Sequence, residues 1–280
     1  MTLVVAVIDQ VTGAVSLGAD SKVTWALDVT RTKRVCTEPA LKIVLLGDDL
    51  AVGYAGDGPE VLASAVTSLR GRGVDELLEG LARIAGASFV VAHRQPAQIW
   101  SVSAEQGIEE RTAIGRAWAG DGSVYPRFQA HFDDLADDSA LLRLQSTMQH
   151  IVHLLRPESV GGYTILASGT ASRAFRYLPL RSELWPESAD TAITGLTQNP
   201  DGTLNFTLRA SFTEGPLVLH VIPGVAPTPG ALGIYVENAG LGYVYPHSTP
   251  AQRVQVRADT LEEFVRLAEA EHDQTVSPGG

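Results

Sequence analysis

Apolar positions near the start of the chain fall in short blocks that are separated by turn residues. Residues 3–8 predict a buried strand, Gly13 marks a turn, and residues 14–19 predict a second strand that returns beside the first. Residues 41–46 and 50–54 predict a third and a fourth strand around a tight turn. Four short strands joined by turns indicate an antiparallel sheet.

The period of the pattern changes at Pro59, a residue that suits the first turn of a helix. Residues 61–69 and 74–84 carry apolar positions at helical spacing. Residues 139–155 form a longer amphipathic stretch, for which Ser139 is the candidate N-cap. The remaining expected elements of this region are a helix after Gly122 and strands over residues 87–92, 98–103, 113–119 and 163–167.

Antiparallel strands that alternate with pairs of helices favour sheets packed together, with helices on their outer faces. The sequence therefore predicts an α+β fold, a four-layer α/β/β/α sandwich, over residues 1–168. Residues 169–258 are expected to form a β-rich extension or to complete the sandwich. Residues 259–280 are expected to form a C-terminal helix and a flexible tail. Thr260 and Glu263 form a capping box at the start of that helix.

The composition excludes several classes of protein. Apolar residues make up 45% of the chain and charged residues 19%, which is a globular balance. The formal net charge of -11 argues against nucleic acid as a partner. The single cysteine, Cys36, excludes an internal disulfide and fits a reducing cytosol. No apolar stretch approaches the roughly 18 residues of a membrane span, and residues 3–8 do not make a signal peptide, so we expect a cytoplasmic protein without a membrane partner.

Motifs for metal, nucleotide or serine-hydrolase chemistry are missing from the sequence. His150 and His153 are three residues apart on a predicted helix, but no acidic or cysteine partner completes a metal site. There is no Gly-x-Ser-x-Gly sequence. The Gly-Asp-Gly turns at residues 56–58 and 120–122 lack the spacing of a phosphate-binding loop. We therefore expect no metal and no cofactor.

An ordered set of short segments resembles the proteasome β-type subunits and the peptidase subunit of the bacterial ATP-dependent protease. The segments are Met1-Thr2-Leu3-Val4-Val5-Ala6-Val7, Gly18-Ala19-Asp20-Ser21-Lys22-Val23-Thr24, Lys42-Ile43, Val52-Gly53-Tyr54-Ala55-Gly56-Asp57, Ile99-Trp100-Ser101-Val102, Ala119-Gly120-Asp121-Gly122-Ser123 and Gly161-Gly162. The resemblance covers about residues 2–168 and implies a divergent member of the N-terminal-nucleophile hydrolases, whose fold is the same four-layer sandwich. It also implies a homo-oligomer, and it leaves an ATPase or other partner open.

Thr2 is the candidate nucleophile. A threonine hydroxyl reacts only when a base takes its proton. The α-amine of Thr2, with an ordinary pKa of about 7.7–8.0, can be that base at neutral pH once Met1 has been removed. The resemblance supplies the supporting groups, which are the ammonium of Lys42, its carboxylate partner Asp20, the neighbouring Lys22 and the oxyanion-binding N–H of Gly53.

The sequence departs from the family pattern in two places. Asp121 stands where the family has a serine. A carboxylate there can still orient the amine, although it raises the pKa of that amine. The family's aspartate and serine before the Gly-Gly pair are replaced around Pro157 and Val160, where Glu158 or Ser159 can compensate.

Each candidate residue also has a purely structural interpretation. A threonine after the initiator methionine is common by chance, and Asp20 and Lys42 can form a structural ion pair. Gly53 can be a strand-end glycine, and Asp121 can be a turn residue. Two functions therefore stay open. One is a threonine-type hydrolase that cleaves a peptide or amide bond after removal of Met1, and the other is a non-catalytic scaffold or binding protein with the same fold.

Overall fold

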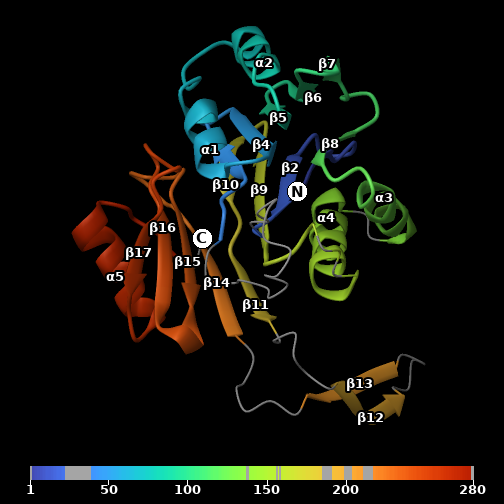
Figure 1. The fold of residues 1–280 in the computed structure, drawn as a ribbon, viewed down its shortest axis with the longest axis vertical. Coiled ribbons are helices and arrows are strands. Elements are labelled where there is room, and N and C mark those ends of the chain that lie inside the picture. Colours follow the sequence, from blue (N-terminus) through green and yellow to red (C-terminus); the bar gives the residue numbers. More distant parts are fainter. Residues whose placement is uncertain are drawn as a thin grey trace.

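The computed structural model describes residues 2–22, 39–136, 139–155, 157, 159–184, 191–198, 204–210 and 217–278. Within these ranges the strands form three five-stranded sheets and one two-stranded sheet, accompanied by five α-helices (Figure 1). All strand pairs are antiparallel, which confirms the expectation of a mixed α/β chain built on antiparallel sheets. Met1, Cys36 and Glu158 lie outside the described residues.

Sheet I contains the opening hairpin that the sequence predicts. Its strand order is β10-β9-β2-β1-β8. The strands are β1 (Leu3–Ile8), β2 (Val15–Asp20), β8 (Arg116–Gly120), β9 (Thr164–Thr170) and β10 (Arg173–Tyr177). In the hairpin Val4 lies opposite Ala19. On the other side of β1, Leu3 lies opposite Gly120, so the first residue of β1 and the last residue of β8 lie side by side at one end of the strands.

Sheet II follows the order β3-β4-β5-β6-β7. Its strands are β3 (Ile43–Leu45), β4 (Leu50–Gly56), β5 (Ala87–Arg94), β6 (Ala97–Ser103) and β7 (Gly107–Glu110). The sequence pattern missed β7, because its residues are half-buried or exposed and show no apolar alternation. Strand β3 is the edge strand of this sheet, and Lys42 directly precedes it.

Two pairs of helices pack on the sheets. The helices α1 (Pro59–Thr67) and α2 (Val74–Ala82) bury Leu62, Leu77 and Leu81 against Val52 and Phe89 of sheet II. The helices α3 (Tyr125–Asp134) and α4 (Ala140–Gln149) share a second cluster with sheet I, formed among others by Leu3, Val5, Phe128, Leu144 and Met148.

The stretch expected as one helix over residues 139–155 consists of two parts. Ser139 caps α4 as expected, because its Oγ accepts a hydrogen bond of 3.4 Å from the N–H of Leu142. From His150 to Leu155 the chain continues as a π-helix. A π-helical turn shifts the side chains relative to the α-helical period, so apolar spacing alone could not locate it.

A third hydrophobic cluster joins the sheets to one another. Val4 and Ala6 of β1 contribute to it from sheet I, and Ile43 and Val90 contribute from sheet II. Because Leu3 and the other alternate residues of β1 face the helices instead, both faces of this strand are covered. Burial on both faces explains why β1 reads as a continuous apolar run rather than as an alternation.

Sheet III lies beside the other two and adds its own apolar side chains to the joining cluster (Figure 1). Its strands are β11 (Leu180–Leu184), β14 (Leu217–Pro223), β15 (Leu232–Val236), β16 (Leu241–Tyr245) and β17 (Val254–Arg257). The helix α5 (Leu261–His272) places Phe264 against Gly233 and Gly242 of this sheet. A side chain at either glycine would collide with the ring.

Several further details concern the C-terminal part of the chain. Strand β9 crosses the expected domain boundary at residue 168. Thr260 caps α5 as expected, because its Oγ1 accepts from the N–H of Glu263 at 3.1 Å. The Glu263 carboxylate accepts from the N–H of Asp259 at 2.9 Å, one residue before the position that a capping box requires. Beyond α5, Val276 is buried and forms a bridge with Gly224. The strands β12 (Thr191–Gln198) and β13 (Leu204–Ala210) form the two-stranded sheet.

Within the described ranges no helix is long and apolar enough to span a membrane.

Candidate active site

Thr2 directly precedes β1 and is almost completely buried, with 3% of its surface exposed. It lies at the end of sheet I where β1 starts and β8 stops. The N–H of Asp121 donates to the carbonyl oxygen of Thr2 at 2.8 Å, which continues the pairing between Leu3 and Gly120 by one residue. The β1–β8 ladder therefore places Asp121 beside Thr2.

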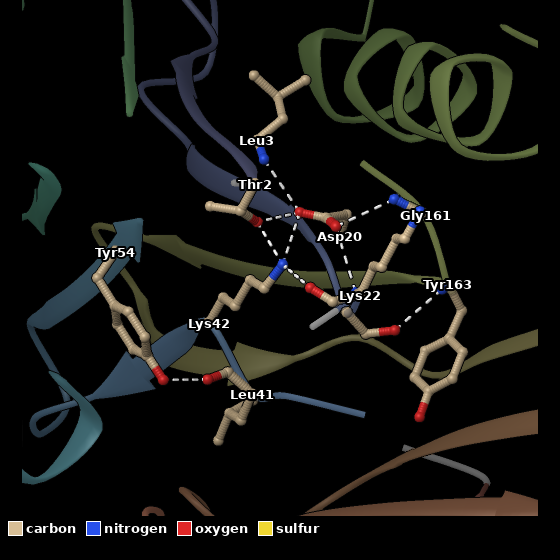
Figure 2. Close-up of polar contacts among 10 residues, drawn as sticks. Thr2, Leu3, Asp20, Lys22, Leu41, Lys42, Tyr54, Gly161 and Tyr163 are labelled. Atoms are coloured by element: carbon tan, nitrogen blue, oxygen red, sulfur yellow. Dashed lines mark hydrogen bonds and ion pairs between the residues drawn. The ribbon is translucent and has the colours of Figure 1, made fainter. Parts of the chain in front are cut away.

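The side chains of Thr2, Asp20 and Lys42 meet in one cluster (Figure 2). The Thr2 hydroxyl donates to Oδ1 of Asp20 and accepts a hydrogen bond from Nζ of Lys42. Nζ of Lys42 also lies 3.0 Å from Oδ1 of Asp20. Thr2 and Asp20 lie together at the open end of the first hairpin, whereas Lys42 reaches across from the segment that begins sheet II. The fold thus brings together three residues that the sequence proposed as a site.

Asp20 is completely buried, and main-chain groups surround its carboxylate. Oδ1 accepts from the N–H of Leu3 at 3.0 Å, and Oδ2 accepts from the N–H groups of Lys22 at 3.2 Å and Gly161 at 3.1 Å. A buried carboxylate is costly unless it is paired and hydrogen-bonded. Asp20 meets both conditions, so its carboxylate has a well-defined position.

Lys42 is also buried, with 4% of its surface exposed. Burial lowers the pKa of its ammonium, while the charge of Asp20 and the hydrogen bond to it act in the opposite direction. The carbonyl oxygen of Lys22 accepts a further hydrogen bond from Nζ at 2.6 Å. Lys22 therefore supports the cluster through its main chain, which binds both Lys42 and Asp20, whereas its positive charge lowers the pKa of Lys42 further.

Asp121 and Ser159, the two residues at the departures from the family pattern, lie next to one another. A hydrogen bond with the Ser159 side chain is the largest cause of the lowered pKa of Asp121, and hydrogen bonds from Ser123 add to it. Oδ1 of Asp121 accepts from the N–H of Ser123 at 2.8 Å and from its hydroxyl at 2.7 Å. The carboxylate is thus held in its charged form beside the main chain of Thr2.

Gly53 lies inside the ladder of sheet II, where it is opposite Ile43 on one side and Val90 on the other. It does not line the pocket that contains Thr2. A Cβ atom at this position would overlap Cγ1 of Val4 in sheet I, so close packing between the sheets accounts for the glycine. Gly53 thus lies in the middle of β4 and not at a strand end, which was the structural alternative that the sequence left open.

A pocket of about 580 Å³ opens next to Thr2. Gly56, at the end of β4, and Gly120, at the end of β8, line it near the nucleophile candidate. Three serines line its wall, and Asp57, Glu105 and Arg111 add charge to the lining. The serines are Ser88, Ser101 and Ser103.

The sequence interpretation missed several groups of this site. The N–H of Gly161 donates to Asp20. Every residue type except proline carries a main-chain N–H, so the sequence showed the Gly-Gly pair but not this hydrogen bond. The serines of the pocket lie on β5 and β6. The apolar pattern of these segments predicts strands, but it does not predict which residues the polar positions face. Only the packing of the sheets brings these residues to Thr2.

The described part of the chain contains no group of three or more His, Cys, Asp or Glu side chains arranged to hold a metal ion. His150, which the sequence considered together with His153, stacks on His131 of α3 with ring centroids 4.0 Å apart. Burial, and then the neighbouring His131, lower the pKa of His150. This pair contributes to the contact between α3 and the helix that follows it.

Solved structures include chains that are similar to this one. The crystal structure of eukaryotic HslV from Trypanosoma brucei is similar to this chain with a TM-score of 0.45 and 15% sequence identity. The similar region covers 60% of this chain and 98% of that protein. No protein-family model matches the sequence, and no curated protein matches it.

Proposed function

We propose that the protein is a threonine-type N-terminal-nucleophile hydrolase that cleaves a peptide or amide bond. The observation that carries this proposal is the position of the Thr2 hydroxyl. It is held between a fully buried carboxylate and a buried ammonium, and it lies at a pocket large enough for a small acyl group. An ion pair with only a structural role would not need to be centred on a hydroxyl beside a pocket.

The first half of the reaction forms an ester on Thr2. After removal of Met1, the neutral α-amine accepts the hydroxyl proton while Oγ1 attacks the carbonyl carbon of the substrate. The ammonium of Lys42 stabilises the negative charge that develops on Oγ1. When the C–N bond of the tetrahedral intermediate breaks, the α-ammonium returns the proton to the leaving amine. The product amine departs, and the acyl group stays on Thr2.

The second half of the reaction uses water. The neutral α-amine takes a proton from a water molecule that attacks the ester carbon, and the C–Oγ1 bond then breaks. The proton passes to Oγ1, which restores the hydroxyl, and a carboxylic acid leaves. In this scheme Asp20 keeps Lys42 in place, while Asp121, assisted by Ser159, orients the α-amine through its charge.

The negative oxygen of the tetrahedral intermediate needs main-chain N–H donors. Gly53 was the expected donor, but Gly56 is the better candidate, because Gly56 lines the pocket beside Thr2 and Gly53 does not. The lining of the pocket includes three serines and the charged residues Asp57, Glu105 and Arg111, which favours a polar acyl group over an apolar one.

The proposed activity goes together with the four-layer α/β/β/α sandwich of the N-terminal-nucleophile hydrolases. The helix pairs that bury one face of sheet I and one face of sheet II, with an apolar cluster between the sheets, support this arrangement. We further propose a cytoplasmic homo-oligomer, with residues 1–168 as the hydrolase core and the later residues as extension, C-terminal helix and tail. An ATPase or other partner stays open.

A second function is a non-catalytic scaffold or binding protein with the same fold. The observation in its favour is Asp121, which takes the place of a serine in the family pattern. The intact cluster of Thr2, Asp20 and Lys42 argues against it, since a scaffold has no need to place a lysine in a buried site where burial works against its charge.

Covalent labelling separates the two functions. The experiment treats the purified protein and its Thr2→Ala variant with a threonine-directed covalent inhibitor and measures the mass gained. The hydrolase proposal predicts one adduct per chain on the unchanged protein and none on Thr2→Ala. Equal labelling of both proteins, or none of either, would favour the scaffold.

A further inference from the structure

Lys42 directly precedes the edge strand β3, and this segment turns its outer carbonyl groups away from the sheet. On the inner side, the carbonyl oxygen of Lys42 accepts from the N–H of Tyr54, and Val44 lies opposite Val52. Because successive residues of a strand point their hydrogen-bonding groups to opposite sides, the carbonyls of the alternate residues 39, 41, 43 and 45 face outward. An edge strand normally leaves such groups to solvent or to another strand.

Here side chains take the place of a neighbouring strand. The Tyr245 hydroxyl donates to the carbonyl oxygen of Pro39 at 2.6 Å, and Nη1 of Arg253 donates to the same oxygen at 2.9 Å. Tyr54 donates to the carbonyl of Leu41, as Figure 2 shows. The remaining contacts are Tyr177 to the carbonyl of Ile43 at 2.7 Å and Arg70 to the carbonyl of Leu45 at 3.3 Å.

These donors come from different parts of the fold. Tyr54 lies in β4 of sheet II and Tyr177 in β10 of sheet I. Tyr245 ends β16 of sheet III, and Arg253 directly precedes β17. Arg70, which follows α1, also binds the segment between β16 and β17, because its guanidinium donates to the carbonyl oxygen of His247 at 2.8 Å. All three sheets therefore converge on the seven residues 39–45.

The three tyrosines are buried, each with no more than 2% of its surface exposed. Burial raises the pKa of all three hydroxyl groups above the ordinary value for tyrosine. Each hydroxyl therefore keeps its proton and acts as a donor over the whole physiological pH range. The row of hydrogen bonds is a permanent part of the structure rather than a pH-dependent one.

We propose that Tyr245 and Arg253 of the C-terminal sheet are positioning residues for Lys42, so that this sheet is an integral part of the active-site framework. The inference rests on the proposed hydrolase function for its catalytic meaning. Both side chains hold the carbonyl of Pro39, three residues before Lys42, and thereby fix where the strand begins. A displaced strand moves Nζ of Lys42 away from the Thr2 hydroxyl and from Asp20, which weakens the stabilisation of charge on Oγ1.

The sequence could not have suggested this role. Tyr245 and Pro39 are separated by 206 positions, and the acceptor is a main-chain oxygen that carries no residue-type signature. Arg253 also stacks on the ring of Tyr243, with its guanidinium carbon 5.0 Å from the centroid, so a neighbour within sheet III holds its guanidinium in place.

The test compares Tyr245→Phe and Arg253→Met with the matched control Tyr235→Phe. Tyr235 is a buried tyrosine of the same sheet, and its hydroxyl donates to the carbonyl of Ala258 at 3.0 Å, within the C-terminal part of the chain. Each tyrosine variant thus loses one buried hydrogen bond from sheet III, but only Tyr245→Phe loses one to the Lys42 segment. Similar thermal midpoints for the two variants establish that they are equally folded.

Two readouts are measured on these variants. The first is the maximal rate of labelling by the threonine-directed inhibitor together with its concentration dependence. We expect a fall of roughly 10-fold to 100-fold in that rate for Tyr245→Phe and Arg253→Met, at unchanged half-saturating concentration, because a small displacement of a catalytic group has an effect of this size. The alkaline limb of the pH profile should move to higher pH, since a less buried Lys42 regains a more ordinary pKa. Tyr235→Phe should change neither.

The second readout does not depend on catalysis. It is amide hydrogen exchange of a peptide that covers residues 39–46, which should become faster in Tyr245→Phe and stay unchanged in Tyr235→Phe. If the unchanged protein is not labelled at all, the hydrolase function fails while the exchange experiment still decides the positioning role. Exchange in residues 39–46 that is equal in Tyr245→Phe and the unchanged protein would overturn the proposal, as would an undiminished labelling rate.

Discussion

The Nζ of Lys42 and the Oδ1 of Asp20 lie 3.0 Å apart, although the two residues belong to segments of different sheets. Lys42 enters β3 of sheet II, and Asp20 ends β2 of sheet I. The ion pair therefore connects the two sheets beside Thr2, which directly precedes β1. The contact between the two sheets and the reactivity of the Thr2 hydroxyl therefore depend on the same two charges.

Removing one member of the pair should be strongly destabilising. Lys42→Met leaves the fully buried Asp20 carboxylate without its positive partner, and we expect the free energy of unfolding to fall by about 3–5 kcal/mol. Urea denaturation at pH 7 measures this change. The double variant Asp20→Asn with Lys42→Met should recover part of the lost stability, because it buries no uncompensated charge. The recovery stays incomplete because the amide has one acceptor oxygen for main-chain N–H groups that bind both carboxylate oxygens of Asp20.

The same double variant distinguishes stability from catalysis. With both charges gone, the protein should fold but should not be labelled at Thr2 by the threonine-directed inhibitor. A stable double variant that is labelled at the rate of the unchanged protein would show that the pair is structural only.

Ser159→Ala should weaken the protein in a pH-dependent way. Hydrogen bonds from Ser159 and Ser123 lower the pKa of Asp121, so this carboxylate stabilises the folded state above its unfolded pKa of about 3.9. That contribution is lost as the pH falls through the lower, folded-state pKa. Urea denaturation between pH 7 and pH 3 should therefore show a difference between the two proteins that is largest at neutral pH and shrinks in acid.

The control for this experiment is Ser16→Ala. The Ser16 hydroxyl lies 2.9 Å from that of Ser168, so the substitution removes a hydrogen bond between two neutral groups. Its effect on stability should be the same at each pH. A difference for Ser159→Ala that is equally independent of pH would contradict the role given to Ser159.

Gly53→Ala should destabilise the fold by overpacking. The added Cβ overlaps Cγ1 of Val4 between sheets I and II, and such collisions in a packed core typically cost about 1–3 kcal/mol. Gly47→Ala is the matched control, because a Cβ there meets no atom within 4 Å. Thermal denaturation of both variants gives the comparison, and equal midpoints would show that the space at Gly53 is not limiting.

Stability should fall in mild acid because of His150. Burial and the stacked His131 lower the pKa of His150, so the folded protein favours its neutral form. The stabilising effect is present above the ordinary pKa of 6.5 and is lost as the pH falls toward the lower, folded-state pKa. His150→Gln should flatten the decline in thermal midpoint between pH 7 and pH 5. An unchanged decline would place its origin elsewhere.

The elements that the sequence predicts best are those with a clear apolar period. Alternating or continuous apolar residues located β1, β2 and β4, and helical spacing located α1 and α2. Strand β7 was not predicted, because its exposed residues show no alternation of apolar and polar positions. The π-helix was not predicted, because a change of helical period leaves the composition of an amphipathic segment unchanged.

The candidate site was predictable only in part, and for a similar reason. Thr2, Asp20 and Lys42 came from the order of short segments, and the fold brings all three into contact. Groups that act through the main chain, such as the N–H of Gly161, have no side-chain signature. Contacts such as that of Tyr245 with Pro39 join residues far apart in the chain, and only tertiary packing determines them.

The intact mass of the purified protein tests the central claim most directly. Thr2 can use its own amine as the base only when it is the first residue of the chain. Mass spectrometry should therefore find a protein lighter by one methionine residue, beginning at Thr2. A mature protein that keeps Met1 would have an amide in place of that amine, and this result would contradict the assignment of Thr2 as an N-terminal nucleophile.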